Sequence, residues 1–216
     1  MSIMIITLED TIKNAVKETF IKLYKNRFVP TDPELWKEES ATIVVTNTKK
    51  EEIDIKILEK KLSTKYNFQK HFPFIDKKIV QVELDYWATE FINAPRLDQV
   101  REYLKNNLQS KRAIINLWND EFRDLNLSCP CATYLYFRKK GKFLEMHSHM
   151  RANNTSFLLF MDMYLLSGIH KYLAESLNLV RGSYIHFVDS LHFYRKELKS
   201  VRKQYTFMNY SNEWKK

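Results

Sequence analysis

Glycine is the residue whose scarcity most constrains this chain. The 216 residues include three glycines, Gly141, Gly168 and Gly182. A P-loop requires two glycines five positions apart, and the dinucleotide-binding fingerprint requires three glycines within six positions. The three glycines match neither spacing, so both glycine-rich phosphate-binding loops are excluded. If this chain binds a nucleotide, side chains must hold the phosphate.

The chain is basic, with 35 Lys and Arg against 26 Asp and Glu and a formal net charge of +9. Such an excess indicates an anionic partner, such as nucleic acid, a phosphorylated metabolite or an acidic membrane. Residues 195–216 hold seven Lys or Arg and two Glu. An interaction surface and a solvated helix face explain that run equally well. Hydrophobic residues make up 44% of the chain, which excludes global disorder.

Several features indicate a reducing, cytoplasmic location. Residues 1–11 lack the basic region and the long apolar run of a secretory signal. The longest apolar stretch, residues 157–169, contains Asp162 and is too short to span a bilayer. Cys129 and Cys131 lie two apart on one face of an expected strand, which is poor geometry for a disulfide. Free thiols fit a cytoplasmic protein.

Hydrophobic periodicity predicts a mixture of helices and strands. Apolar residues at helical spacing predict helices over residues 8–26, 79–92, 97–108 and 157–178. Strand patterns occur over residues 41–46, 53–57, 113–118, 132–138, 143–150 and 184–194. The sequence contains no repeat, low-complexity tract or Gly/Ser linker. One α+β domain over residues 1–216 is the most economical interpretation.

The sequence also predicts a helix start, an inward helix face, a hairpin turn and a C-terminal helix. Thr7 to Asp10 has the form of a capping box that opens the first helix. Val82, Tyr86 and Phe91 are expected to face inward from the second helix. Residues 139–142 are expected to form the turn of a hairpin, and a basic helix is expected to close the chain.

Cys131 is a candidate nucleophile, because it follows Pro130 at the start of a predicted strand and a thiolate is strongly nucleophilic. Taken alone, a buried structural cysteine explains it better. Cys129 adds no zinc site, because a two-residue pair lacks the usual ligand spacing. His147 and His149 share a strand face, but no third ligand is identifiable. We therefore expect no metal site.

An ordered set of motifs surrounds Cys131. It comprises Asp98-Gln99, Leu104 to Asn107, Ser110 to Ile115, Trp118-Asn119, Pro130-Cys131, Tyr134 to Arg138, Arg151 to Asn154, Asp162, Gly182 to Phe187 and His192 to Tyr194. In order and spacing, this set resembles the thymidylate synthase family, which includes the pyrimidine-nucleotide hydroxymethylases. The resemblance covers about residues 79–200. It implies an α+β fold of the thymidylate synthase type, with a mixed sheet packed against long helices, and a back-to-back homodimer.

The resemblance assigns the chemistry to Cys131 and Glu83. The Cys131 thiolate would add to carbon 6 of a pyrimidine, which makes carbon 5 nucleophilic toward the one-carbon unit of 5,10-methylenetetrahydrofolate. Glu83 would organise water and proton transfer at the base. Taken alone, Glu83 is equally an ordinary exposed helix residue.

The resemblance also implies how the nucleotide is held. Arg151 would lower the pKa of Cys131 and bind a phosphate oxygen. Lys111 and Arg112 match a basic pair that reaches the phosphate in the partner subunit's site, so the homodimer would share its active sites. His192 and Tyr194 match a pair that binds the sugar hydroxyl from one strand face. Without the resemblance, these residues would be solvated charges and a half-buried strand pair.

Asp162 occupies the base-reading position of the family, where thymidylate synthases carry an asparagine that suits uracil. A carboxyl group suits cytosine better, because it can accept from the exocyclic amine and, when protonated, donate to the ring nitrogen. Related cytidylate hydroxymethylases carry aspartate there. The simpler alternative is a helix N-terminal aspartate stabilised by the dipole.

Some positions depart from the family pattern. Ala152 replaces a phosphate-binding serine, and Asn154 replaces a folate-contacting aspartate, although Asn154 stays in the expected nucleotide-binding set. The tail that closes over folate is expected to be absent, which would admit water and disfavour hydride transfer.

These observations predict 5-hydroxymethylation of dCMP, or CMP, with 5,10-methylenetetrahydrofolate, through a covalent cysteine adduct. The nearest alternative is a thymidylate synthase that methylates dUMP. An alternative of another class is a non-catalytic nucleic-acid-binding homologue that uses the basic C-terminal segment. The Lys-, Ile- and Asn-rich composition suggests an AT-rich genome, which is compatible with a phage.

Overall fold

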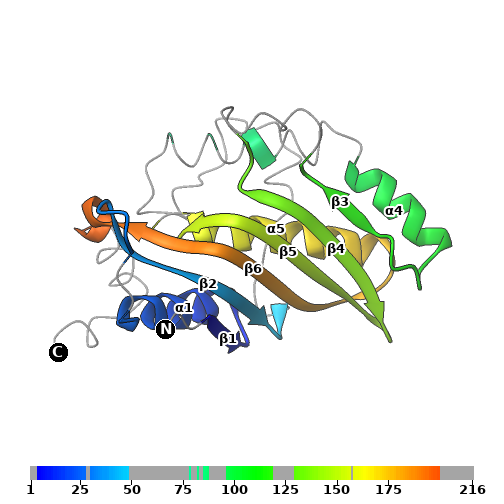
Figure 1. Ribbon diagram of the computed structural model, residues 1–216. Coiled ribbons are helices and arrows are strands. Elements are labelled where there is room, and N and C mark those ends of the chain that lie inside the picture. Colours follow the sequence, from blue (N-terminus) through cyan, green and yellow to red (C-terminus); the bar gives the residue numbers. More distant parts are fainter. Residues whose placement is uncertain are drawn as a thin grey trace.

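The computed structural model describes residues 4–27, 30–48, 78, 82, 85–87, 96–118, 129–156 and 158–199. The strands in these ranges form one mixed sheet in the order β1-β2-β6-β5-β4-β3 (Figure 1). They are β1 (Ile5–Glu9), β2 (Leu35–Val45), β3 (Ile114–Asn116), β4 (Ala132–Lys140), β5 (Phe143–Asn154) and β6 (Val180–Tyr194). The helices are α1 (Ile12–Lys25), α4 (Arg96–Asn106) and α5 (Leu158–Ser176), with a 3₁₀ turn at Arg195–Glu197. The predicted α+β class with a mixed sheet is confirmed.

The sheet combines parallel and antiparallel pairs. β4 and β5 form an antiparallel hairpin, β5 and β6 are parallel, and β2 joins β6 in antiparallel fashion. α5 packs against β5 and β6, and α1 packs against β1, β2 and α5. Figure 1 shows α5 behind the strands, so the other face of β4, β5 and β6 carries no helix of the described chain.

Helix α5 is the centre of the core because it is apolar on nearly every side. Buried residues recur through its whole length, from Leu159 to Ala174, and among them is one carboxyl, Asp162. β6 contributes alternate residues to the same core, including Tyr184, Val188 and Phe193. No helix in the described ranges is both long enough and apolar enough to cross a membrane.

The N-terminal segment differs from the sequence prediction. Ile5–Glu9 is strand β1, and α1 begins only after Thr11, whose hydroxyl accepts from the Asn14 backbone nitrogen over 3.2 Å. The predicted capping box at Thr7 is therefore wrong. Thr7 is buried between two exposed neighbours, as strand periodicity requires, and its hydroxyl accepts from Thr19 of α1 over 2.9 Å.

The other predicted elements are largely confirmed, with shifted ends. α4 and α5 match the helices predicted over 97–108 and 157–178, and the hairpin turns at Gly141, which has φ +58°. β2 and β6 begin earlier than predicted, and β3 is a short edge strand with Ile114 half exposed rather than a buried one.

The helix predicted over 79–92 is described only in part, at positions that are helical. Val82 was expected to face inward, but it is exposed, and Trp87 is buried instead. The strand predicted over 53–57 and most of the basic C-terminal helix lie outside the described residues.

Candidate functional site

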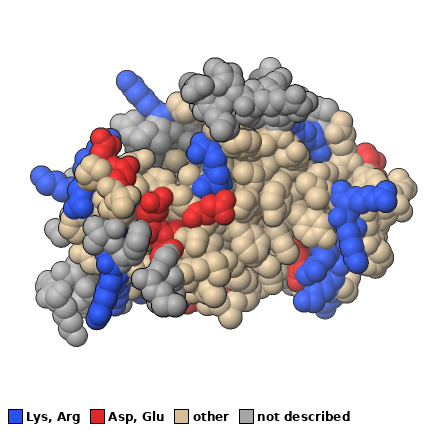
Figure 2. Space-filling view, in the orientation of Figure 1, with Lys and Arg blue, Asp and Glu red and all other residues tan. Residues whose placement is uncertain are grey.

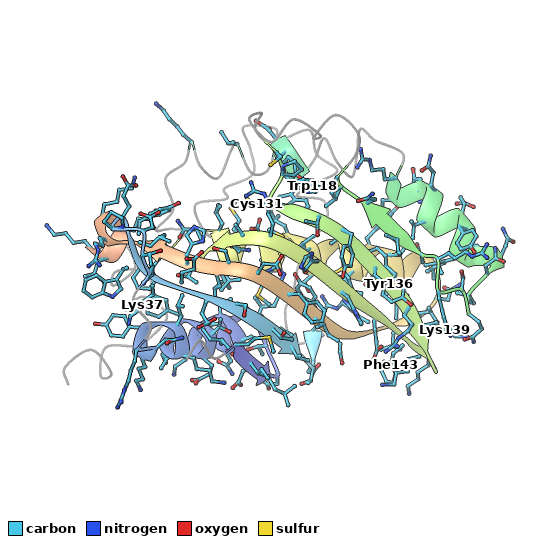
Figure 3. The ribbon with its side chains drawn as sticks, viewed as in Figure 1. Lys37, Trp118, Cys131, Tyr136, Lys139 and Phe143 are labelled. Carbon is cyan, nitrogen blue, oxygen red and sulfur yellow. The ribbon has the colours of Figure 1, made fainter. Side chains whose placement is uncertain are left out.

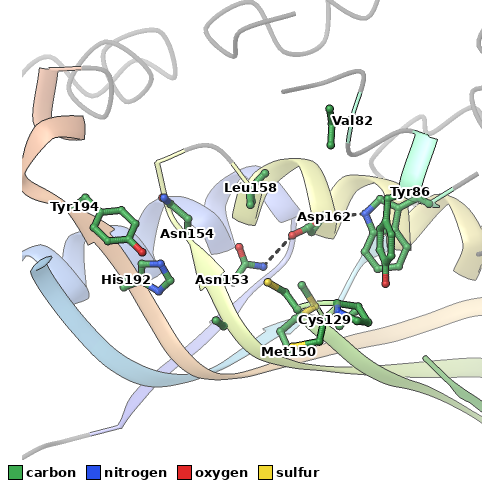
Figure 4. Close-up of a pocket in the computed structure, with 15 residues that line it drawn as sticks. Val82, Tyr86, Cys129, Met150, Asn153, Asn154, Leu158, Asp162, His192 and Tyr194 are labelled. Atoms are coloured by element: carbon green, nitrogen blue, oxygen red, sulfur yellow. Dashed lines mark hydrogen bonds between the residues drawn. The ribbon is translucent and has the colours of Figure 1, made fainter. Parts of the chain in front are cut away.

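A cavity of about 640 Å³ lies at the edge of the sheet where β4 begins and β5 ends (Figure 4). Its walls come from the start of β4, the end of β5, the first turns of α5 and the end of β6. Five residues predicted from the sequence line it, namely Cys131, Asn154, Asp162, His192 and Tyr194. The fold therefore gathers side chains that are up to 63 positions apart in the chain.

Cys131 is a partly buried cysteine, in no disulfide, at the start of β4, and Figure 3 shows it at the opposite end of that strand from Lys139. Backbone contacts hold its segment on both sides. The Cys131 carbonyl accepts from the Arg151 backbone nitrogen over 2.8 Å, and the Pro130 carbonyl accepts from Trp118 Nε1 over 3.1 Å. The thiol is thus carried on a fixed backbone at the cavity wall.

Arg151 is exposed and binds the segment that precedes the thiol. Its Nε donates to the Pro130 carbonyl over 3.2 Å, and its Nη2 donates to the Cys129 carbonyl over 3.1 Å. The guanidinium therefore lies beside the segment that precedes Cys131, although Arg151 does not line the cavity itself.

Asp162 is a buried carboxyl on the second turn of α5, with 2% of its surface exposed. Its Oδ1 accepts from Trp87 Nε1 over 3.1 Å, and its Oδ2 accepts from Asn153 Nδ2 over 3.2 Å (Figure 4). Asp162 is thus held by side chains in the cavity wall, unlike a solvated aspartate at a helix N-terminus.

His192 and Tyr194 both line the cavity from one face of β6, and their rings pack edge to face with centroids 5.3 Å apart. His192 Nδ1 lies 3.1 Å from the Ser190 carbonyl oxygen, which places a proton on Nδ1. In the neutral ring, Nε2 is then the acceptor. This pair offers one acceptor and one phenol to a ligand hydroxyl.

Asn154 ties the end of β5 to the turn after β6. Its Nδ2 donates to both carboxylate oxygens of Glu197, over 3.0 and 3.1 Å, and its Oδ1 accepts from the Ser156 backbone nitrogen over 2.7 Å. Glu197 also accepts from the Tyr194 backbone nitrogen over 3.0 Å. Both polar ends of Asn154 are therefore engaged within the protein.

Three further predicted residues are not brought to the cavity by the described chain. Lys111 and Arg112 are exposed in the turn between α4 and β3 and do not line the cavity. Glu83 lies outside the described residues. The structure thus joins the predicted thiol, base and sugar groups within one chain, and leaves the predicted basic pair elsewhere.

The two histidines considered as metal ligands lie on the open face of the sheet. His149 Nδ1 lies 2.7 Å from Thr133 Oγ1 and its Nε2 3.2 Å from Asp189, while the His147 ring packs edge-on against Tyr136. Among the residues that the structure describes, no group of three or more His, Cys, Asp or Glu could hold a metal ion.

Sequence reasoning missed Asn153 and Trp87, which both donate to Asp162. Buried positions along β5 alternate through Met146, Ser148 and Met150 and then skip to Asn153. Strict strand alternation would instead turn position 154 inward. The neighbours of Asn153 are mostly polar, as in Arg151, Asn154 and Thr155, so the sequence did not show that its side chain points inward.

Behind Asn153 lies a buried polar cluster. His186 Nε2 lies 3.4 Å from Asn153 Nδ2, and His186 Nδ1 lies 2.7 Å from Ser148 Oγ and 2.9 Å from Tyr184 Oη. Burial lowers the pKa of His186 to about 3, and burial raises the pKa of the Tyr184 phenol. The cluster is therefore uncharged at neutral pH.

Comparison with known proteins gives one consistent family. A family model described as thymidylate synthase matches residues 83–212 of the chain. Thymidylate synthase of Mycoplasma pneumoniae is 25% identical over 117 residues, which are 54% of this chain and 41% of that protein. Bifunctional dihydrofolate reductase-thymidylate synthase 2 of Arabidopsis thaliana is 25% identical over 140 residues, or 64% of this chain and 24% of that protein. The matches thus span less than half of each relative.

A solved structure gives a match of similar extent. The thymidylate synthase of T4 phage covers 50% of this chain and 38% of its own, with 18% sequence identity and a TM-score of 0.46.

Proposed function

The chain belongs to the thymidylate synthase family, and on that premise we propose that it transfers a one-carbon unit to carbon 5 of a cytosine nucleotide. The reaction we favour is the 5-hydroxymethylation of dCMP or CMP. The observation that carries this proposal is the shared cavity of Cys131 and Asp162. A nucleophile and a base-reading carboxyl in one cavity are what this chemistry needs.

Cys131 supplies covalent catalysis in this proposal. Its thiolate forms a bond to carbon 6 of the pyrimidine, and the electron pair of the 5,6 double bond makes carbon 5 nucleophilic. Once carbon 5 has bonded to the one-carbon unit, it loses its proton, and the amine of the one-carbon donor would then leave. Water adds to the resulting exocyclic methylene carbon, and expulsion of the thiolate restores the 5,6 double bond. Arg151, whose guanidinium binds the backbone beside this thiol, provides a cation for the substrate phosphate.

Asp162 determines, in this proposal, which pyrimidine base the site prefers. With two donors already bound, its carboxylate presents acceptors to a ligand. The 4-amino group of cytosine can donate to such an acceptor, whereas the 4-carbonyl of uracil would face it with lone pairs. A buried polar group left unpaired costs about 1–3 kcal/mol, which is enough to set a preference of ten- to a hundredfold.

The one-carbon donor used by the family is 5,10-methylenetetrahydrofolate, and we propose it here on that ground alone. Asn154 stands where the family contacts folate, but its amide is engaged by Glu197 and Ser156. Its amide nitrogen is therefore already committed to Glu197, and we assign no step to a folate contact.

We further propose a homodimer formed across the open face of the sheet. Figure 2 shows a broad uncharged area over this face, between patches of Lys and Arg. Aromatic and histidine rings pack there in pairs, such as Tyr134 with His149 and Tyr136 with His147. A second copy would cover these rings, and it could bring Lys111 and Arg112 to the phosphate of the neighbouring site.

Release of tritium from carbon 5 tests the proposal, with dCMP, CMP and dUMP compared side by side in the presence of the folate. We expect release from a cytosine nucleotide without formation of dihydrofolate. Activity on dUMP alone would overturn the choice of base, and formation of dihydrofolate would overturn hydroxymethylation. No release from any nucleotide, with salt-dependent RNA or DNA binding that survives Cys131→Ser, would support the non-catalytic alternative.

A further inference from the structure

Asn153 lies between the Asp162 carboxyl and the buried imidazole of His186. Its amide nitrogen donates to Asp162 Oδ2 over 3.2 Å and lies 3.4 Å from His186 Nε2. Asn153 is 2% exposed, and its buried amide oxygen has no hydrogen-bond partner within the described chain. The contacts of the nitrogen, rather than those of the oxygen, therefore determine how the amide is turned.

His186 offers an acceptor to the Asn153 amide in the orientation that the Asp162 carboxylate favours. The ring is completely buried, and burial, followed by the charge of His149, lowers the pKa of His186 to about 3. At neutral pH the ring therefore carries one proton. Nδ1 faces two hydroxyl groups, those of Ser148 and Tyr184, and either can accept that proton. Because Asn153 Nδ2 donates to the Asp162 carboxylate, it is an N–H group that faces His186 Nε2, so Nε2 is the acceptor and the ring proton lies on Nδ1.

The reversed orientation of the amide is unfavourable. A half turn of the Asn153 amide would place Oδ1 against Asp162 Oδ2 and His186 Nε2, which are both acceptors. Oxygen lone pairs facing a carboxylate and an imidazole lone pair repel each other, and the repulsion is strong in a buried site. Asn153 is thus fixed as a donor to Asp162, alongside Trp87 Nε1.

We propose that Asn153, held between Asp162 and the buried ring of His186, is a positioning residue that keeps Asp162 a hydrogen-bond acceptor toward the cavity and so makes the site select pyrimidines with an amino group at carbon 4. The inference rests on the proposed function, in which Asp162 contacts the base. It adds Asn153 and His186 to Asp162 as residues that determine which base the site prefers.

Equilibrium binding of dCMP and dUMP tests this role without any requirement for turnover or folate. Calorimetric titrations use the full chain carrying Cys131→Ser, so that no covalent adduct forms. We expect this protein to prefer dCMP, and we expect Asn153→Leu, which has a similar size but no amide, to lower the ratio of the two affinities by about tenfold. His186→Phe keeps Asn153 but lets its amide turn, and should lower the ratio by a smaller factor, about threefold.

A matched control separates positioning from loss of stability. Thr19→Val removes a comparable buried hydrogen bond, from Thr19 to Thr7 over 2.9 Å, at a site that does not line the cavity. We expect it to leave the affinity ratio unchanged, because an unfolded fraction lowers the apparent binding of dCMP and of dUMP by the same factor. If Asn153→Leu does not fold, Asn153→Ser carries the same test with a side chain too short to reach Asp162.

An unchanged ratio in the folded Asn153 variants, or an equal change in Thr19→Val, would overturn the inference. Equal binding of dCMP and dUMP before any change at Asn153 would also overturn it, while leaving transfer to carbon 5 open. A preference for dCMP that Asn153→Leu abolishes, in a protein that releases no tritium, would support the inference and overturn the proposed function.

Discussion

The two ends of the β4–β5 hairpin hold carboxyl groups in opposite surroundings. At the turn, Glu145 is paired with the charges of Arg138 and Lys140, at 2.5 and 3.4 Å. At the cavity, the Asp162 carboxyl accepts from Trp87 and Asn153, which carry no charge. A carboxyl neutralised by cations stabilises the fold. We therefore expect the ion pairs at the turn to contribute to stability and the cavity carboxyl, in the proposed function, to contact a ligand.

The largest expected effect is at the cavity end. Cys131→Ser should reduce tritium release from dCMP at least about a thousandfold, because a serine hydroxyl is a far weaker nucleophile than a thiolate. The affinity for dCMP should change by no more than a fewfold. Cys129→Ser is the matched control and should retain most of the activity. Equal losses in the two variants would remove the assignment of the nucleophile to Cys131.

The next effect is at the turn end and concerns stability. A Cβ added at Gly182 would lie 2.7 Å from the Leu144 carbonyl oxygen of the neighbouring strand. Backbone atoms cannot move aside easily, so Gly182→Ala should lower the free energy of unfolding by about 1–3 kcal/mol. Chemical denaturation measures the loss. If tritium release per folded molecule fell as well, this would contradict the view that the turn end affects stability and not activity.

The smallest effect tests the ion pairs at the turn. Burial alone would raise the pKa of Glu145, but its hydrogen bond to Arg138 and the charges of Arg138 and Lys140 outweigh this and leave the pKa below 4.5. A carboxyl with a lowered pKa in the folded state stabilises the fold above pH 4.5, and this contribution is lost as the pH falls through the lowered value.

Glu145→Gln should therefore be less stable than the wild type by about 1 kcal/mol or less at pH 7. The two melting curves should converge when the pH is lowered below 4.5. A difference that persisted in acid would show that Glu145 acts through packing rather than charge.

The hairpin also shows what the sequence could predict. Alternating residues around Gly141 fixed both strands and the turn, since local pattern and turn chemistry agree there. The helix start predicted at Thr7 was wrong because the same residues fit both a capping box and a strand. The strand forms because Ile5–Glu9 pairs with β2, which is distant in the sequence. Element type was thus predictable where the deciding contacts are local.

The residues of the candidate site also differ in whether the sequence alone could predict them. Cys131 and Asp162 could be predicted because the spacing of a family motif carries them. Asn153 and His186 could not, because their proposed role depends on a shift in strand alternation and on the contacts that the Asn153 amide nitrogen makes with Asp162 and His186. These are properties of packed neighbours that no linear motif encodes.

The most direct test of the central claim is the covalent bond between Cys131 and the pyrimidine. Fluorine at carbon 5 cannot leave as a proton, so the 5-fluoro analogue of dCMP should remain attached to the enzyme in the presence of folate. Intact-protein mass spectrometry followed by peptide mapping should find one nucleotide on the peptide that contains Cys131, with less adduct from the 5-fluoro analogue of dUMP. An adduct formed only with the uracil analogue, or none on Cys131 with either, would contradict the account.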